Sequence, residues 1–277
     1  MAYNTSRYWV DKEHRAEVAR NHTELMAEEF AEEIEDCVAE TYLYDTNFKL
    51  DLNDYGNNET DVNIIVCDLD SVAAILEYKD DITAVLNFAS FKNPGGMFLK
   101  GSKAQEECLC HESYLYNVLR EHSDFYAENN KMKNKALYKN RALYTENVLF
   151  ERDNRYAYCD VITCAAPNKT AAQKYCNVSN KENSEVLKSR IKFVIDVAVY
   201  GGANTLILGA YGCGVFGQDP HEVATIFKEI LDQYPKLFKT VVFAIPNKKS
   251  ENYKAFKEVF NKWLEHTQKL YQENILN

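Results

Sequence analysis

The sequence predicts an α/β protein with three layers, in which helices cover both faces of one sheet. Short apolar runs rich in β-branched residues alternate along the chain with longer segments of helical periodicity. Several of these runs are apolar on both faces, as a sheet covered on both sides requires. Two glycine-rich loops each join such a run to a helix, which is the arrangement at the ligand-binding edge of open α/β sheets.

The chain opens with helical sequence. Residues 11–44 contain no Gly or Pro, are rich in Ala and Glu, and space their apolar residues close to helical turns. One or two helices are therefore expected there. The polar composition of residues 51–61 indicates a long loop.

The remainder alternates between the two kinds of element. The expected strands are residues 63–67, 82–88, 142–150, 156–164, 204–209 and 239–245. The expected helices are residues 70–78, 103–122, 182–200, 221–234 and 252–273.

The first glycine-rich loop follows strand 82–88. Gly95, Gly96 and Gly101 precede a helix that Ser102 and Gln105 open as a capping-box pair at the S-x-x-Q spacing. Glycines let backbone N–H groups approach phosphate oxygens, and a helix N-terminus adds favourable partial charge. On its glycines alone, this loop is interpreted as a simple tight turn, because such turns outnumber phosphate sites.

The second loop, residues 209–217, holds four glycines, and Asp219 and Pro220 then fit the N-cap and the first helical position. Two such loops predict a crevice that takes an anion such as a diphosphate. Neutral N–H donors explain how a chain with 42 acidic and 32 basic residues, at a net charge of -10, could hold it. That charge argues against general binding of duplex nucleic acid or of an anionic membrane.

Eight cysteines lie mostly on expected strands and helices, without repeated C-x-x-C spacing. Reduced thiols and a cytoplasmic location are therefore expected, and no apolar segment approaches the roughly 20 residues that span a bilayer. Cys108 and His111 share a helix face, but a metal site needs more ligands. No metal and no cofactor are expected.

Both loops resemble those of a known family. The runs NFA at 87–89, NPGG at 93–96, QEE at 105–107 and GAYGCGVFGQDP at 209–220 are similar to the microbial type of poly(ADP-ribose) glycohydrolase, a macrodomain family. The resemblance extends over about residues 61–260. It implies a macrodomain with a mixed sheet in residues 61–277, preceded by an N-terminal helical accessory region in residues 1–60.

The resemblance implies a hydrolase that releases ADP-ribose, with Glu107 as the catalytic acid and Glu106 binding a ribose hydroxyl. Cleavage of a ribose O-glycosidic bond passes through an oxocarbenium-like state and needs a proton on the departing oxygen. Consecutive helical residues point about 100° apart, so one carboxylate should act and the other support it. A helix start favours charged Glu, so acid function requires burial or a neighbouring charge to raise the pKa.

Met97 stands where the family signature has the third of three glycines. A side chain there obstructs a close backbone approach or a positive φ, although methionine is flexible enough to turn aside. A non-catalytic reader of ADP-ribose is therefore one alternative, although the retained Q-E-E favours the enzyme. Others are a mono-ADP-ribosyl hydrolase acting on protein or nucleic-acid conjugates, and an unrelated nucleotide-binding protein.

Several candidate residues have two interpretations each. Phe216 resembles the family aromatic that shapes the distal ribose pocket, or is a packed loop residue. Asn87 and Asn93 bind the terminal ribose or stabilise turns. Asp68 holds the adenine amino group, or Asp68 or Asp70 caps a helix.

The expected partners are ADP-ribose, poly(ADP-ribose) and ADP-ribosylated proteins. The full substrate-binding set implied by the resemblance is Asp68, Asn87, Asn93, Gly95, Gly96, Met97, Gln105, Gly209, Gly212, Cys213, Gly214, Val215, Phe216 and Gly217.

Overall fold

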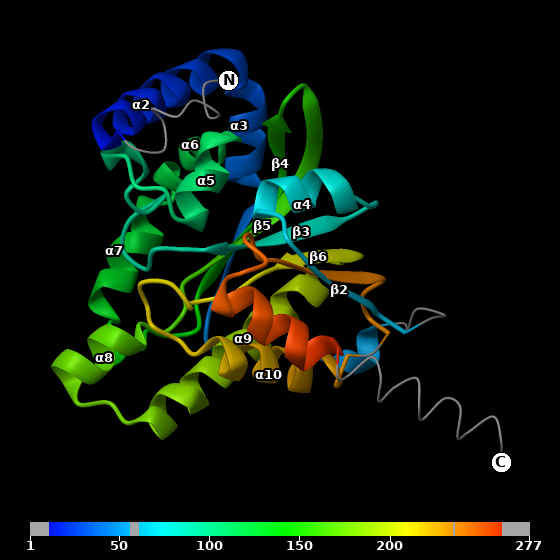
Figure 1. Cartoon of the computed structure of the whole chain (residues 1–277). Coiled ribbons are helices and arrows are strands. Elements are labelled where there is room, and N and C mark those ends of the chain that lie inside the picture. Colours follow the sequence, from blue (N-terminus) through cyan, green and yellow to red (C-terminus); the bar gives the residue numbers. More distant parts are fainter. Residues whose placement is uncertain (1–10, 56–60, 235, 262–277) are drawn as a thin grey trace.

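The computed structural model describes residues 11–55, 61–234 and 236–261. Its strands form one mixed sheet in the order β1-β4-β5-β3-β6-β7-β2 (Figure 1). Strands β2, β3, β5, β6 and β7 run parallel, and β4 and β1 continue the sheet by antiparallel pairing. Their bounds are β1 Thr41–Tyr44, β2 Asn63–Cys67, β3 Thr83–Phe88, β4 Ala142–Arg152, β5 Arg155–Cys164, β6 Thr205–Leu208 and β7 Thr240–Ala244.

Helices cover both faces of the sheet (Figure 1). One face carries α2 Lys12–Glu29, α3 Ala31–Ala39, α4 Ser71–Tyr78, α5 Gln105–His111 and α6 Leu115–Glu121. The other carries α9 Asn180–Tyr200, α10 Pro220–Leu231 and the helical residues 251–261. The remaining elements are α7 Ser123–Lys131, α8 Lys169–Cys176 and the 3-10 turns η2 Leu52–Asp54, η3 Phe98–Lys100 and η4 Asn134–Ala136.

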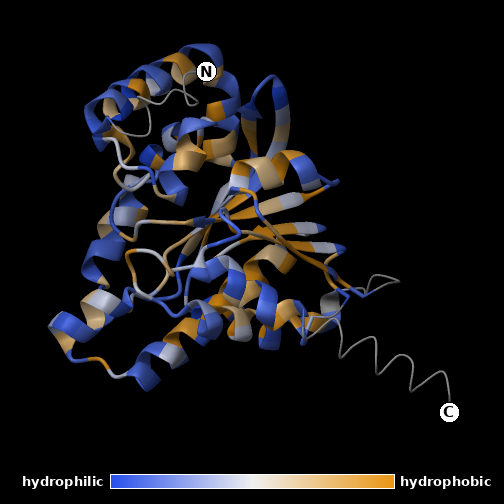
Figure 2. Ribbon diagram, viewed as in Figure 1, coloured by the Kyte–Doolittle hydropathy of each residue, from blue (hydrophilic) through white to orange (hydrophobic). Residues whose placement is uncertain are grey.

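Strand β3 shows how the sheet builds two cores. Ala84 and Leu86 belong to the cluster shared with α9 and α10, whereas Val85 belongs to the cluster shared with α4, α5 and α6. All three are fully buried. Alternate residues of one strand thus pack on opposite helical layers, and Figure 2 shows apolar residues along the strands and on the helix surfaces that face them. The three-layer prediction is confirmed.

The structure corrects the expected elements at three places. Thr41–Tyr44 is not helical but forms edge strand β1, because its aromatic and β-branched residues pair with β4. The expected helix 103–122 is two helices, since Ser113 between them pairs with Phe150. Helices α7 and α8 were not expected.

Two expected elements extend beyond what the structure describes. Residues 56–60 of the loop and residues 262–273 of the last helix lie outside the described residues. Within the described ranges, no helix combines the length and the apolar character needed to cross a membrane.

Candidate functional site

The site lies beyond the carboxyl end of β3. Asn87, on this strand, is fully buried, and its Nδ2 lies 3.3 Å from Oε1 of Glu106 and 3.3 Å from Oγ1 of Thr163 on β5. The chain then makes the first glycine-rich loop and enters α5, which carries the Q-E-E run in its first turn. Sheet, loop and helix thereby meet at two adjacent glutamates.

Glu106 is a buried acid whose pKa lies well above its usual range. Its side chain is 3% exposed, and its Oε2 accepts a 2.7 Å hydrogen bond from the N–H of Ser90. Burial raises the pKa of Glu106 to about 8, with a further increase from the Glu107 charge, although the bonds from Ser90 and Asn87 oppose it. Burial beside the first loop therefore favours the protonated form of Glu106.

Glu107 joins the two ends of the loop. Its Oε1 accepts a hydrogen bond from the N–H of Met97 and its Oε2 accepts one from the N–H of Ala104, both 2.8 Å long. The side chain is 5% exposed. Because both oxygens accept bonds from a fixed backbone, the carboxyl group has one defined orientation.

At Gly96 the loop backbone lies so close to both carboxyl groups that no side chain fits between them. A Cβ atom on Gly96 would lie 2.6 Å from Oε1 of Glu107 and 2.9 Å from Oε2 of Glu106, and its φ is +61°. Gly95 has a φ of +59° and lies against the Tyr116 ring. Both positions thus require glycine, for space and for backbone conformation.

The backbone conformation at Met97 does not require a glycine. Its φ is -114° and ψ is 32°, and its side chain is 40% exposed. The residue that departs from the family signature therefore keeps the N–H contact to Glu107 without backbone strain. The concern that this position requires a positive φ is not supported by the structure.

The expected capping box is wrong. Helix α5 begins two residues later than expected, with Ala104 as its N-cap, and Glu107 rather than Gln105 bonds back to the N-cap N–H. Gln105 instead accepts from the N–H of Phe88 and donates to Ser71 Oγ and to the carbonyl of Leu86. Gln105 thereby fixes the start of α5 to the end of β3.

The second loop turns over the end of β6. Asp219 caps α10 and Pro220 is its first residue, as predicted. Gly209 packs against the carbonyl of Ala244, whereas Gly212 and Gly217 have φ values of +76° and +70°. These three glycines therefore determine the backbone path of the loop.

The tip of this loop is open. A Cβ on Gly214 would meet no atom within 4 Å, and Val215 is 88% exposed. In the part of the chain that the structure describes, the N–H groups of Gly214, Val215 and Phe216 donate to no protein acceptor. Successive N–H groups of this kind suit an anion. Cys213, just before the tip, is a partly buried thiol whose pKa burial raises to about 12.

Phe216 links the loops through an aromatic stack. It is half-buried and lies edge-on to Tyr138, with ring centroids 6.3 Å apart. Tyr138 stacks on Phe91 of the first loop at 4.1 Å. The sequence did not point to Tyr138 or Phe91, because residues from three separate segments form this stack.

Asn93 and Asp68 are exposed. Asn93 uses its backbone in a turn, since its N–H lies 3.2 Å from Ser90 Oγ and its carbonyl accepts from Gly96. Asp68 accepts a bond from the N–H of Asn247 after β7, and the N-cap of α4 is Asp70. Asp68 therefore does not cap α4.

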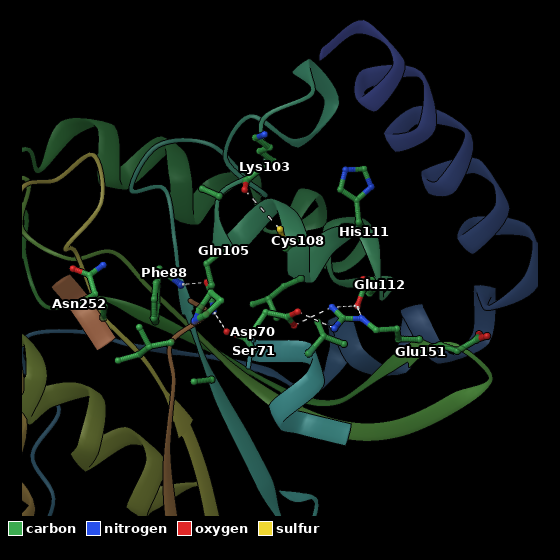
Figure 3. Close-up of a pocket in the computed structure, with 18 of the residues that line it drawn as sticks. Asp70, Ser71, Phe88, Lys103, Gln105, Cys108, His111, Glu112, Glu151 and Asn252 are labelled. Atoms are coloured by element: carbon green, nitrogen blue, oxygen red, sulfur yellow. Dashed lines mark hydrogen bonds and ion pairs between the residues drawn. The ribbon is translucent and has the colours of Figure 1, made fainter. Parts of the chain in front are cut away.

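A cavity of about 670 Å³ lies beside Gln105, on the side away from Glu106 and Glu107 (Figure 3). Phe88, Gln105 and Ala210 form its wall towards the loops, and Ile245 and Asn252 line it near β7. Glu106 and Glu107 lie outside its lining. The cavity thus lies beside the ends of β3 and β6, next to the two glutamates.

The far end of this cavity contains an ion-pair cluster. Arg152 bonds both oxygens of Asp70, at 2.8 and 2.9 Å, and Glu112 at 2.7 Å (Figure 3). Burial raises the pKa of Glu112 to about 7, although Arg152 opposes this. No sequence pattern connects these residues, which the hairpin of β4 and β5 brings to α4 and α5.

Among the described residues, no group of three or more His, Cys, Asp or Glu side chains has the arrangement of a metal site. All eight cysteines are free thiols.

Comparison with known proteins shows which family this chain is similar to. Residues 13–153 match the family model for the microbial-type PARG catalytic domain, where PARG denotes poly(ADP-ribose) glycohydrolase. No curated protein matches the chain.

Solved structures extend the similarity over most of the chain. Poly(ADP-ribose) glycohydrolase from Thermomonospora curvata is 29% identical over 90% of this chain and 100% of that one, with a TM-score of 0.81. Its complex with the inhibitor ADP-HPD is 31% identical over 89% and 99%, with a TM-score of 0.78. The enzyme from Deinococcus radiodurans, in complex with ADP-ribose, is 28% identical over 83% and 98%, with a TM-score of 0.74.

Proposed function

The chain belongs to the microbial-type poly(ADP-ribose) glycohydrolase family, and on that premise we propose that it hydrolyses ribose O-glycosidic bonds to release ADP-ribose from poly(ADP-ribose). The observation that carries this proposal is the pair Glu106 and Glu107. The pair is buried, lies against Gly96 and contains a group whose pKa is about 8. It can therefore hold a proton at neutral pH beside the loops of an ADP-ribose site.

Glu107 is the proton donor in this proposal. Its two N–H bonds fix the carboxyl group beside the first loop. In this proposal the proton held by Glu106 passes to Glu107, which delivers it to the departing ribose oxygen as the bond from that oxygen to C1 breaks. Water then adds to C1 and returns a proton to the carboxylate, so the reaction leaves the enzyme unchanged. Glu106 holds a ribose hydroxyl and keeps the sugar in position.

The substrate lies across both loops. The open N–H groups at Gly214, Val215 and Phe216 hold the diphosphate, and Phe216 bounds the distal ribose. The adenosine end extends toward Asp68 and the cavity wall at Phe88 and Gln105.

A reader without activity is less well supported than a hydrolase. That alternative rested on Met97, whose ordinary φ of -114° leaves the backbone free of strain. A binding protein would also have no need for a buried acid with a raised pKa.

The direct test is to incubate the purified protein with poly(ADP-ribose) and with mono-ADP-ribosylated protein, and to quantify free ADP-ribose. Release from the polymer alone supports the proposal. Release from the protein conjugate alone would make the chain a mono-ADP-ribosyl hydrolase, and tight ADP-ribose binding without any release would make it a reader.

We further propose a cytoplasmic location, which eight free thiols support. We also propose that residues 1–60 serve as an accessory region to residues 61–277. Helix α2 packs against η3 and β1 extends the sheet, so this region is built onto the main domain.

A further inference from the structure

We infer that Arg15, on the N-terminal helix α2, is a positioning residue that sets the orientation of Glu107 through the first glycine-rich loop. This inference rests on the proposed function, since it concerns how the same site reaches its working geometry. Arg15 lies far from Glu107 in the sequence and on a different element.

Arg15 holds the loop by a buried bond. Its side chain is 7% exposed, and its Nε donates a 2.7 Å hydrogen bond to the carbonyl of Gly101. A charged donor makes a strong bond to a carbonyl, especially where water is excluded. Arg15 therefore fixes the position of one loop carbonyl against α2.

The backbone of Gly101 touches the helix directly. A Cβ there would lie 2.1 Å from the carbonyl oxygen of Lys12 and 3.0 Å from the nitrogen of Ala16, and its φ is +75°. Only glycine permits this approach. The loop thus rests on the first turns of α2, and Figure 1 shows α2 beside α5 and α6.

Gly101 lies between the two backbone donors of Glu107. Met97 and Ala104 donate to the two carboxyl oxygens, and the carbonyl of Met97 accepts from Ser102, the residue after Gly101. A shift of Gly101 therefore moves both donors together.

Phe98 adds a second anchor between α2 and α5. Its ring lies edge-on to His22 of α2, with centroids 6.5 Å apart, and to His111 of α5, at 4.6 Å. Arg15 and Phe98 hold opposite ends of the η3 turn.

The test compares Arg15→Met with Asn117→Ala. Methionine keeps much of the apolar stem but removes the donor. Asn117 is the matched control, because its buried Nδ2 donates 3.0 Å to the carbonyl of Thr23 and ties α2 to α6 rather than to the loop. Both variants should lower the melting temperature.

Only Arg15→Met should lower kcat for poly(ADP-ribose), by about 10- to 100-fold, because a small misplacement of a catalytic group costs that much. The Kd for ADP-ribose should change less than about threefold, since the diphosphate is held by the other loop. Arg15→Met should add no further loss to Glu107→Gln, because the two act through one group. Equal kcat losses in Arg15→Met and Asn117→Ala would overturn the inference.

Amide hydrogen exchange tests the contact without any assay of activity. Exchange at Met97 and Ala104 should quicken in Arg15→Met and stay unchanged in Asn117→Ala. If the parent protein cleaves no polymer, the proposed function fails, whereas unchanged exchange in Arg15→Met defeats the positioning role. Should Arg15→Met not fold, Arg15→Lys, which keeps the charge but has no Nε–H at that point, takes its place in both measurements.

Discussion

The backbone N–H of Met97 donates a 2.8 Å hydrogen bond to Oε1 of Glu107. The residue that replaces the third glycine of the family signature thus contributes to the site through an atom that every non-proline residue has. Met97 itself is 40% exposed to solvent. The departure changes an exposed side chain and leaves the contact to the carboxyl group in place.

Met97→Gly should therefore change kcat and the ADP-ribose Kd by less than about threefold. The backbone at this position already has an ordinary φ of -114°, so glycine relieves no strain and adds about 0.5–1 kcal/mol of entropic cost. Steady-state kinetics and calorimetry check this. A tenfold gain in turnover would mean that the methionine side chain narrows the ribose site.

Glu107→Gln should lower turnover by about 10² or more, the usual contribution of general acid–base catalysis, because Gln has no ionisable proton. ADP-ribose affinity should change little. Glu106→Gln should instead weaken binding as well as rate, since Glu106 positions the ribose in our proposal. A folded Glu107→Gln protein with the turnover of the parent would refute the assignment.

The turnover of the parent should fall as pH rises through about 8. The pKa of Glu106 is near that value because the side chain is buried, so the pair loses its proton above it and can no longer protonate the departing oxygen. A pH–rate profile from 5 to 10 measures this. A rate that is flat between pH 7 and 10 would contradict it.

Stability gives an independent readout of the same group. The pKa of Glu106 is raised on folding from 4.5 to about 8, so the folded state binds more protons than the unfolded state between these pH values. The free energy of unfolding of the parent therefore falls as pH rises through this range. Relative to the parent, Glu106→Gln should therefore gain unfolding free energy between pH 5 and pH 9 in urea titrations. A constant difference across this range would show that burial does not shift the group.

Gly96→Ala and Gly214→Ala should affect different properties of the protein: the first should lower stability and turnover, and the second should lower only the affinity for ADP-ribose. At Gly96 a methyl group meets both carboxyl groups and a φ of +61°, so we expect a loss of about 1–2 kcal/mol from the backbone alone and little turnover. At Gly214 the space is open, so stability should stay within about 0.5 kcal/mol.

Gly214→Ala should nevertheless raise the ADP-ribose Kd about tenfold, equivalent to about 1.4 kcal/mol, because the methyl group occupies the space that the diphosphate approaches. Thermal unfolding and calorimetry on the same samples separate the two effects. Unchanged affinity in Gly214→Ala would place the diphosphate elsewhere.

Local sequence predicted most elements and the two loops. Alternating apolar runs specified six strands, and Asp219 with Pro220 marked the start of α10, because these signals depend on burial and capping within a few residues. It failed at Thr41–Tyr44 and at Ser113, where pairing with β4 overrides the helical pattern of the neighbouring residues.

By itself, the sequence determined the α/β alternation, the family resemblance and the adjacency of Glu106 and Glu107. Only the tertiary structure decided which of them is buried beside Ser90 with a raised pKa, and which bonds the ends of the loop. It also brought Arg15 to Gly101, and Arg152 to Asp70. The reason is physical: covalent neighbours are fixed by the chain, whereas burial, charge and hydrogen bonding at a site depend on segments that only packing brings together.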